Sequence, residues 1–286
     1  MSPFDAARIR SASRTDVGRR RSENQDDFRE FEHTSGARLL ALADGMGGHR
    51  GGRTASRMAI EAMGEVFASR QSPNHDTLRE AMEAANTRIY DVASRRSELR
   101  GMGTTGVALL FRTDGLACVA HVGDSRAYRL REGSIAPLTA DHSFVASLLE
   151  QGEITAEEAA VHPRRNEILR SIGSGPSVEV DVAPVETRPG DQFLLCSDGL
   201  SGVLTDSEIG SVLLREHPEK AVEILVDLAN ERGGPDNITV MVAAMPDESM
   251  ASNSETERTG NDSRRIRWIL AATALIGALL ALCLIR

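Results

Sequence analysis

The chain has 286 residues, of which 41% are hydrophobic and only 3% aromatic. That length accommodates one large domain or two small ones, with a core built from aliphatic side chains. The formal net charge of −9 at pH 7 excludes general nucleic-acid binding, which needs clustered positive charge. The cysteines, Cys118, Cys196 and Cys283, form no CxxC pair. They indicate a reducing compartment and argue against a disulfide framework or structural zinc.

Apolar residues recur at helical spacing in three segments. They predict amphipathic helices over residues 55–67, 78–92 and 221–229, with their apolar stripes in the core. A final strand is predicted at Ile238–Ala244.

Three short strand-like runs follow the first two helices, at Gly106–Phe111, Leu116–Val122 and 126–130. The connections between them are too short for crossover helices, which predicts antiparallel pairing. Helices in pairs and strands in runs are typical of a layered α+β fold rather than a doubly wound parallel sheet.

The C-terminal part of the sequence differs in character. After a domain predicted at residues 1–246, residues 247–264 read as a flexible polar linker. Residues 265–286 hold an uncharged apolar run that begins at Trp268, long enough to span a bilayer as a helix. The arginines within 264–267 predict that the large domain faces the cytoplasm. The N-terminus has no apolar run, so it is not a secretory signal.

Three acids lie beside apolar, strand-like runs and next to Gly or Asn. Asp44 ends the run in LLALADGMGG, Asp198 does so in FLLCSDG, and Asp236 precedes one in GGPDNITV. Carboxylates at strand ends can converge at one rim of a sheet, where they repel each other unless cations such as Mg²⁺ or Mn²⁺ neutralise them. Asp-Gly is also a common hairpin turn, and Asp114 is interpreted as only that.

Eight short motifs follow one another along the chain. They are NQDD (24–27), ADGMGGH (43–49), MGTT (102–105), GDSR (123–126), LTADHS (138–143), RSIG (170–173), SDG (197–199) and PDNIT (235–239). In this order they resemble the protein phosphatase 2C family, most closely its bacterial serine/threonine phosphatases. The resemblance covers about residues 10–245.

The resemblance implies an α/β/β/α sandwich of two antiparallel sheets flanked by helix pairs, with a two-metal site at one edge. By position, Asp44 resembles the acid that bridges both metal ions, and Gly45 resembles the residue that lends a backbone carbonyl. Asp198 and Asp236 resemble the ligands of one metal ion.

Three further residues take roles from the same resemblance. Asp26 resembles an acid that serves the other metal ion through water, and Asp124 resembles the ligand of a third, looser cation. Arg21 resembles the clamp for the substrate phosphate, although Arg19 and Arg20 adjoin it and leave the register open. Residues 142–166 resemble the family's mobile flap.

The chemistry implied is hydrolysis of phosphoserine or phosphothreonine in proteins by a metal-bridged hydroxide, with two or three Mn²⁺ or Mg²⁺ ions. Two metal ions about 3.5–4 Å apart lower the pKa of a bridging water and neutralise the phosphoryl oxygens. Many animal members of the family have a histidine where this chain has Met46. His49 is interpreted as a surface-loop residue, which leaves a metal-bound water as the acid for the leaving group.

Other enzyme classes fit poorly. Cys118 and Cys196 lack the arginine six positions later that a cysteine-dependent phosphatase needs, and the lone lysine, Lys220, lies far from any Gly-rich loop. No HExxH motif occurs. Two alternatives stay open: an inactive, membrane-tethered phosphoprotein-binding scaffold, and a hydrolase acting on partner-switching regulators of sigma factors.

The expected partners are phosphoproteins, above all bacterial Ser/Thr kinases and their targets, with no nucleic acid. The expected location is the inner membrane, with a single span and a monomeric catalytic domain facing the cytoplasm.

Overall fold

The computed structural model describes residues 6–246. The predicted linker and membrane segment, 247–264 and 265–286, lie outside the described residues, so these domain boundaries stay predictions. Within residues 6–246, no helix is both long and apolar enough to cross a membrane.

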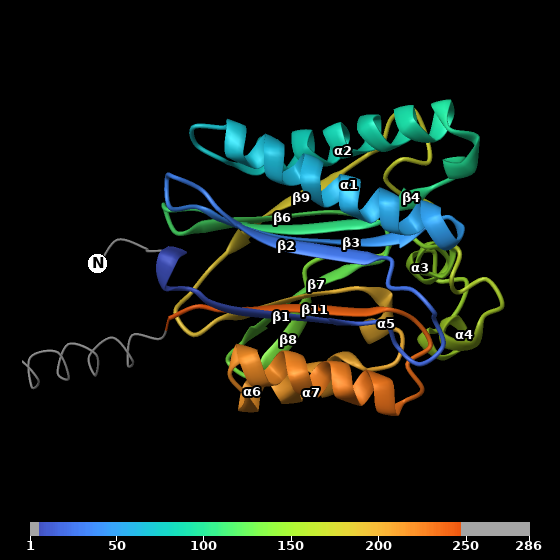
Figure 1. Ribbon diagram of the computed structural model, residues 1–286. Coiled ribbons are helices and arrows are strands. Elements are labelled where there is room, and N and C mark those ends of the chain that lie inside the picture. Colours follow the sequence, from blue (N-terminus) through green and yellow to red (C-terminus); the bar gives the residue numbers. More distant parts are fainter. Residues whose placement is uncertain (1–5, 247–286) are drawn as a thin grey trace, which may run out of the picture. The chain divides into compact units, whose positions relative to one another are not determined.

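Two antiparallel sheets lie face to face in the described domain (Figure 1). One has the order β1 (Arg10–Asp16), β11 (Ile238–Ala244), β10 (Gln192–Cys196), β7 (Arg126–Arg131) and β8 (Ser134–Pro137). The other has the order β2 (Asp26–Glu32), β3 (Arg38–Met46), β5 (Gly106–Phe111), β6 (Leu116–Val122) and β9 (Asp181–Glu186), with β4 (Gly103–Thr104) paired to β3.

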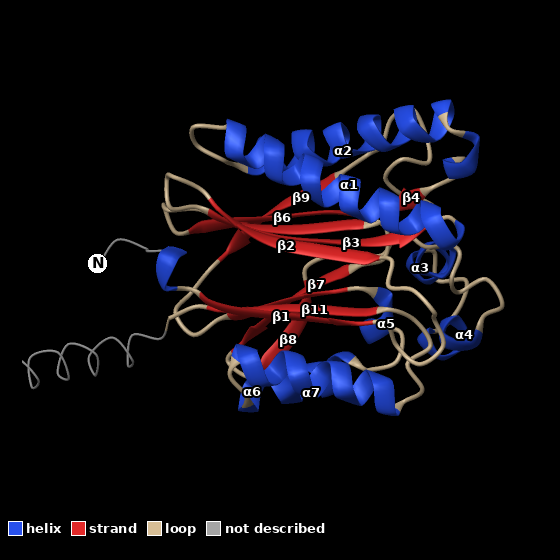
Figure 2. Cartoon of the chain, viewed as in Figure 1, coloured by secondary structure: helices blue, strands red, loops and turns tan. Residues whose placement is uncertain are grey.

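A pair of helices covers the outer face of each sheet (Figure 2). The β2-containing sheet carries α1 (Gly48–Ser69) and α2 (His75–Arg95), and the β1-containing sheet carries α6 (Asp206–Arg215) and α7 (Pro218–Glu231). The remaining helices are short: α3 (Phe144–Glu150) and α4 (Ala156–Val161) in the predicted flap, α5 (Asp198–Ser201), and 3₁₀ turns at Ala6–Arg8 and Ser97–Leu99.

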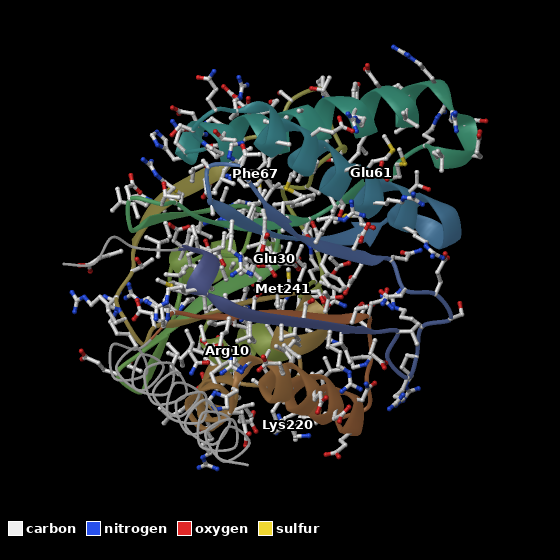
Figure 3. The ribbon with its side chains drawn as sticks, turned by 60° about the vertical axis from the view of Figure 1, so that its left-hand side comes forward. Arg10, Glu30, Glu61, Phe67, Lys220 and Met241 are labelled. Carbon is white, nitrogen blue, oxygen red and sulfur yellow. The ribbon has the colours of Figure 1, made fainter. Side chains whose placement is uncertain are left out.

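The core has three apolar layers, one between the sheets and one under each helix pair. Met241 lies between the sheets, whereas Phe67 of α1 packs against the other face of the β2-containing sheet (Figure 3). Lys220 and Glu61 lie on the outer faces of α7 and α1 (Figure 3). The predicted α/β/β/α sandwich is therefore confirmed.

Most predicted elements are confirmed. The three helices lie within α1, α2 and α7, and the strands Gly106–Phe111, Leu116–Val122 and Ile238–Ala244 have the predicted bounds. Asp114 lies in the β5–β6 hairpin turn, where its Oδ1 accepts from the Leu116 N–H at 3.2 Å. Cys118 and Cys196 are buried in β6 and β10 as small apolar side chains.

One predicted pairing is wrong. β5 pairs with β6, but β7 does not continue that sheet; it pairs with β10 and β8 in the opposite sheet. The turn between β6 and β7 begins at Gly123, whose φ of +104° is accessible to glycine but strained for other residues. A short connection thus carries the chain from one sheet to the other, and it leaves Asp124 at the rim between them.

We expect Gly123→Ala to destabilise the domain by about 2–4 kcal/mol, because the new methyl group would lie 2.7 Å from Thr105 Cγ2 in a backbone conformation unsuited to alanine. Gly133→Ala is the matched control: its φ is +79° and nothing lies within 4 Å of the added Cβ, so only the backbone term of about 1 kcal/mol applies. Urea denaturation measures both variants. Equal losses would show that the close packing on Thr105 contributes nothing.

Candidate active site

Two of the predicted acids face each other directly across neighbouring strands. Asp26 begins β2 and pairs in register with Asp44 near the end of β3. Both therefore lie at the same end of the sheet. The same rim receives Asp124, which follows β6, because Asp124 interacts electrostatically with Asp44.

The opposite sheet supplies the other two acids. Asp198 is the first residue of α5, directly after β10, and Asp236 lies in the turn before β11. β10 and β11 are antiparallel neighbours, so the end of one meets the start of the other. Asp198 lies close enough to Asp44 and to Asp236 for their charges to interact. The two sheets thus bring all five predicted carboxylates together.

Hydroxyl groups position Asp26 and Asp44, the two acids of the β2-containing sheet. Asp26 Oδ2 accepts from Ser197 Oγ at 2.9 Å and from Thr239 Oγ1 at 2.6 Å. Both hydroxyl groups belong to the β1-containing sheet or to the residue that follows its strand β10. The Asp44 backbone is held by the MGTT motif: its N–H donates to Thr105 Oγ1 at 3.0 Å, and its carbonyl accepts from Thr104 Oγ1 at 2.8 Å.

Gly45 lies beside Asp44 at a point of close backbone approach. Its N–H donates to the Gln25 carbonyl at 3.2 Å, and a Cβ at this position would lie 2.2 Å from the Gly52 carbonyl oxygen of α1. A side chain is therefore excluded at this position.

Arg21 reaches the rim from the loop between β1 and β2. Its Nη2 donates to Asp236 Oδ2 at 2.7 Å, and its side chain is 55% exposed. The neighbouring Arg19 does not take this position; its backbone N–H donates to the Gly234 carbonyl at 2.8 Å. Of the three consecutive arginines, all within the described residues, Arg21 is the one that lines the cleft beside the carboxylates, and its role as phosphate clamp stays a prediction.

Buried Asn237 holds that loop in place. Its Nδ2 donates to the Val17 and Glu23 carbonyls, both at 3.0 Å, and its Oδ1 accepts from the Gln25 N–H at 2.8 Å. One side chain thus anchors both ends of the segment that carries Arg21.

A cleft of about 700 Å³ opens over the carboxylate rim. Arg21, Asp124, Asp198 and Asp236 line it near the acids. The flap forms another part of its wall through apolar residues of α3 and α4, Val145, Ala146, Leu149, Ala156, Ala159 and Ala160. The cleft is therefore larger than a phosphoryl group needs and includes an apolar side.

Burial and mutual repulsion raise the pKa values of four of these acids. Burial is the largest cause for each acid. Burial and the charge of Asp198 together raise the pKa of Asp26 and of Asp124 to about 7. The pKa of Asp198 rises to about 6 through burial and the charge of Asp236, and that of Asp44 rises well above its usual range through burial and the charge of Asp26.

Residues 17–238 match the family model described as protein phosphatase 2C. The chain belongs to the protein phosphatase 2C family. It is a metal-dependent protein phosphatase, and its cofactor is Mn²⁺ or Mg²⁺.

Curated bacterial members of the family are similar in sequence. The serine/threonine protein phosphatase PstP of Mycobacterium tuberculosis is 42% identical over 242 residues, which cover 84% of this chain and 45% of PstP. The protein phosphatase PhpP of Streptococcus pneumoniae is 39% identical over 239 residues, covering 82% of this chain and 96% of PhpP.

Solved structures share the fold. The Streptococcus agalactiae serine/threonine phosphatase superimposes with a TM-score of 0.77 at 38% identity, covering 83% of this chain and 99% of that one. The PstP catalytic domain in complex with two manganese ions gives a TM-score of 0.75 at 39% identity, covering 84% and 99%.

The acidic rim of this phosphatase fits divalent metal ions. Buried oxygens of Asp26, Asp124 and Asp198 (Oδ1 in each) have no hydrogen-bond partner among the described residues. Leaving a buried acceptor unsatisfied is unfavourable by about 1–3 kcal/mol, and hard cations prefer clustered carboxylate oxygens. A cation would satisfy these oxygens and neutralise the repulsion between the acids.

Sequence reasoning missed the residues that support the acids. Ser197, Thr239 and Asn237 lie inside the quoted SDG and PDNIT motifs, and Thr105 lies in MGTT, so the motifs contained the signal without assigning the roles. In the flap, Ser143 caps the start of α3 and Glu150 ends that helix. The side chain of His49 lies outside the described part, so its interpretation stays a prediction.

We expect Asp124→Asn to stabilise the metal-free phosphatase more at about pH 8 than at about pH 5, by a difference of about 1–3 kcal/mol. The ordinary pKa of Asp124 is 3.8 and its folded value is about 7. Because the folded pKa is the higher one, the stability contributed by Asp124 is fully present below about pH 4 and is lost progressively as the pH rises to about 7. Urea denaturation in EDTA measures this difference.

Asp114→Asn is the control for that experiment, because Asp114 is a 45% exposed acid in a hairpin turn. Its effect on stability should be the same at both pH values. If Asp124→Asn also gave equal effects at the two pH values, the repulsion assigned to the rim would be wrong.

Proposed function

We propose that this phosphatase hydrolyses phosphoserine and phosphothreonine in proteins, and so reverses the action of bacterial Ser/Thr kinases. The observation that carries the proposal is the convergence of five carboxylates at one rim, three of which line a cleft together with the exposed guanidinium of Arg21. The names of PstP and the S. agalactiae relative, both serine/threonine phosphatases, support the same substrate class.

The proposed ligand sets are those that the family resemblance implies for the acids at this rim. Asp44, Asp198 and Asp236 would hold one metal ion, and Asp44 with the Gly45 carbonyl would hold the second, served by Asp26 through water. Asp124 and Asp198 would hold a third, looser ion. When bound, the ions supply Lewis-acid activation of the water that attacks phosphorus, and they neutralise charge on the phosphoryl oxygens.

Arg21 binds the substrate in this proposal. A guanidinium fork donates two parallel hydrogen bonds to phosphoryl oxygens, which a lysine cannot do with fixed geometry. Its ion pair with Asp236 holds the side chain at the cleft mouth, while its exposed surface leaves donors for a phosphate. The hydrogen bond to Asp236 raises the pKa of Arg21, and the charges of Asp236, Asp198 and Asp44 raise it further.

The rest of the cleft suits a protein substrate. No side chain of α3 is buried, and Val145 and Leu149 from this helix line the cleft. An apolar wall of this kind can pack against side chains next to the phosphorylated residue and exclude water there.

We expect the full chain to release phosphate from phosphoserine and phosphothreonine peptides with Mn²⁺ and to be silenced by EDTA. Asp44→Asn and Asp198→Asn should each lower kcat/KM by at least about a hundredfold, because each removes a ligand charge from the metal site. Steady-state kinetics measure this, with Asp114→Asn as an Asp-Gly control of unchanged activity.

The outcomes separate the alternatives. Full activity of Asp44→Asn would refute the two-metal assignment. A wild-type chain that binds phosphopeptides but stays at background turnover with both Mn²⁺ and Mg²⁺ would favour the phosphoprotein-binding scaffold.

We also propose that residues 265–286 anchor the phosphatase in the inner membrane, with the catalytic domain on the cytoplasmic side. The apolar run from Trp268 and the arginines within 264–267 support this. The linker at 247–264 would let the cleft reach neighbouring phosphoproteins, such as membrane-bound kinases.

Deletion of residues 265–286 should move the protein from the membrane fraction to the supernatant after cell lysis. Deletion of residues 250–259 in the linker is the control, because it shortens the tether but keeps the apolar run, and the protein should stay with the membrane. Recovery of the full chain in the supernatant would refute the anchor.

A further inference from the structure

Two histidines stack against each other beside the flap, outside the carboxylate rim. His121 is on β6 and His142 is the first residue of the flap; their ring centroids are 4.5 Å apart with an interplanar angle of 27°. His121 is 5% exposed. Its Nε2 lies 2.7 Å from the Ala140 carbonyl, so it donates there. The mechanism proposed above uses neither residue.

His142 satisfies both backbone groups of Gly123. Its own N–H donates to the Gly123 carbonyl at 2.9 Å, and its ring Nδ1 accepts from the Gly123 N–H at 3.1 Å. Gly123 precedes Asp124 and starts the turn between the two sheets. The position of the Asp124 carboxylate therefore depends on a backbone segment that His142 holds from the flap side.

The same residue also ties the two ends of the flap together. The His142 carbonyl accepts from the Leu169 N–H at 2.8 Å, and the Phe144 N–H donates to the Glu167 carbonyl at 2.9 Å. Release of His142 from Gly123 would consequently loosen the base of the flap as well as the turn.

The tautomer of His142 follows from its neighbours. Because Nδ1 accepts from Gly123, the proton of the neutral ring is on Nε2. Nε2 lies 3.3 Å from Asp181 Oδ2, which can accept that proton, and 3.2 Å from Arg170 Nη1, which cannot. Arg170 holds Asp181 in place through Nη1, 2.6 Å from Oδ1. Burial, with the neighbouring His121 and Arg170, lowers the pKa of His142. The ring therefore stays neutral near pH 7 and keeps the lone pair that Gly123 needs.

A metal ion is a poorer explanation of this group. His121, His142 and Asp181 offer ligand atoms within 4.8 Å of one another. However, the stacked rings hold their lone pairs in nearly parallel planes, so the two rings do not aim at a common point. The His142 Nδ1 lone pair is also occupied by the Gly123 N–H. Hydrogen bonding accounts for these contacts more directly.

We propose that His142 is a positioning residue that locks the turn at 123–124 to the base of the flap, and so presents Asp124 to the cleft. The inference rests on the proposed function in one respect: phosphatase turnover is the activity that the position of Asp124 affects. Loss of the ring acceptor should loosen the turn and the flap together and weaken the cation site to which Asp124 contributes.

The chain allows a matched set of variants. In His142→Asn the side-chain oxygen occupies the place of Nδ1 and can accept from Gly123, whereas His142→Gln places its amide near Nε2 and loses that acceptor. His162 is the control in the flap: its Nδ1 accepts from the Arg164 N–H at 3.1 Å, far in the sequence from Gly123, so His162→Gln removes a similar bond without touching the turn.

Amide hydrogen exchange of the full chain in EDTA tests the lock without any need for turnover. In His142→Gln, peptides covering 120–126 and 142–169 should exchange roughly three- to tenfold faster, as expected for one lost hydrogen bond. His142→Asn should stay within about twofold of wild type in both regions. His162→Gln should leave peptides 120–126 unchanged. Equal exchange in His142→Gln and His142→Asn would overturn the proposal.

Mn²⁺ binding by titration calorimetry tests the link to Asp124. His142→Gln should weaken the weakest resolved Mn²⁺ site by roughly three- to tenfold, with His142→Asn near wild type. In an Asp124→Asn background the same substitution should have less than about a twofold effect, because both changes act on one site. Additive effects would show that His142 acts elsewhere. If wild type proves inactive on phosphopeptides, the proposed function fails, while exchange and binding still decide the role of His142.

Discussion

Mutual repulsion among buried carboxylates is the constraint on which the rest of this structure depends. Asp26, Asp44, Asp124, Asp198 and Asp236 come from both sheets and meet at one rim. There, burial and the charges of neighbouring acids together raise the pKa values of Asp26 and Asp124 to about 7 and that of Asp198 to about 6, and raise that of Asp44 well above its usual range. Such a cluster opposes folding unless positive charge enters it. The divalent metal ions on which the family depends supply that positive charge, and phosphoryl transfer uses the same charge.

The two-sheet architecture places the polar rim at the edge of an apolar core. Each sheet packs its own helix pair over one apolar layer, and a third layer, which includes Met241, fills the space between the sheets. Polar side chains lie at the edge of that space. At that edge, hydroxyls of Ser197 and Thr239 reach Asp26 from the opposite sheet, and Asn237 anchors the loop of Arg21. Hydrogen bonds between the two sheets therefore hold the carboxylates in place against their mutual repulsion.

Sequence patterns predicted the features that local spacing determines. The strands Leu116–Val122 and Ile238–Ala244 were predicted to the residue because each apolar run is bounded by turn residues. The pairing of residues 126–130 was wrong, because a positive φ at Gly123 redirects the chain to the other sheet and no periodicity reports that. The partners of Asp26 lie 171 and 213 residues away in sequence, so only the folded chain reveals them. The site roles came from family resemblance rather than from spacing.

Proton release on Mn²⁺ binding tests the central claim most directly. If the rim carboxylates are partly protonated in the metal-free phosphatase, binding must displace those protons. Calorimetric titrations in two buffers of different ionisation enthalpy should then give different heats at about pH 6.5, corresponding to about one or more protons released, and the difference should shrink at about pH 8.5. Equal heats in the two buffers at the lower pH would mean that the acids are already ionised without metal, and would contradict this account of the rim.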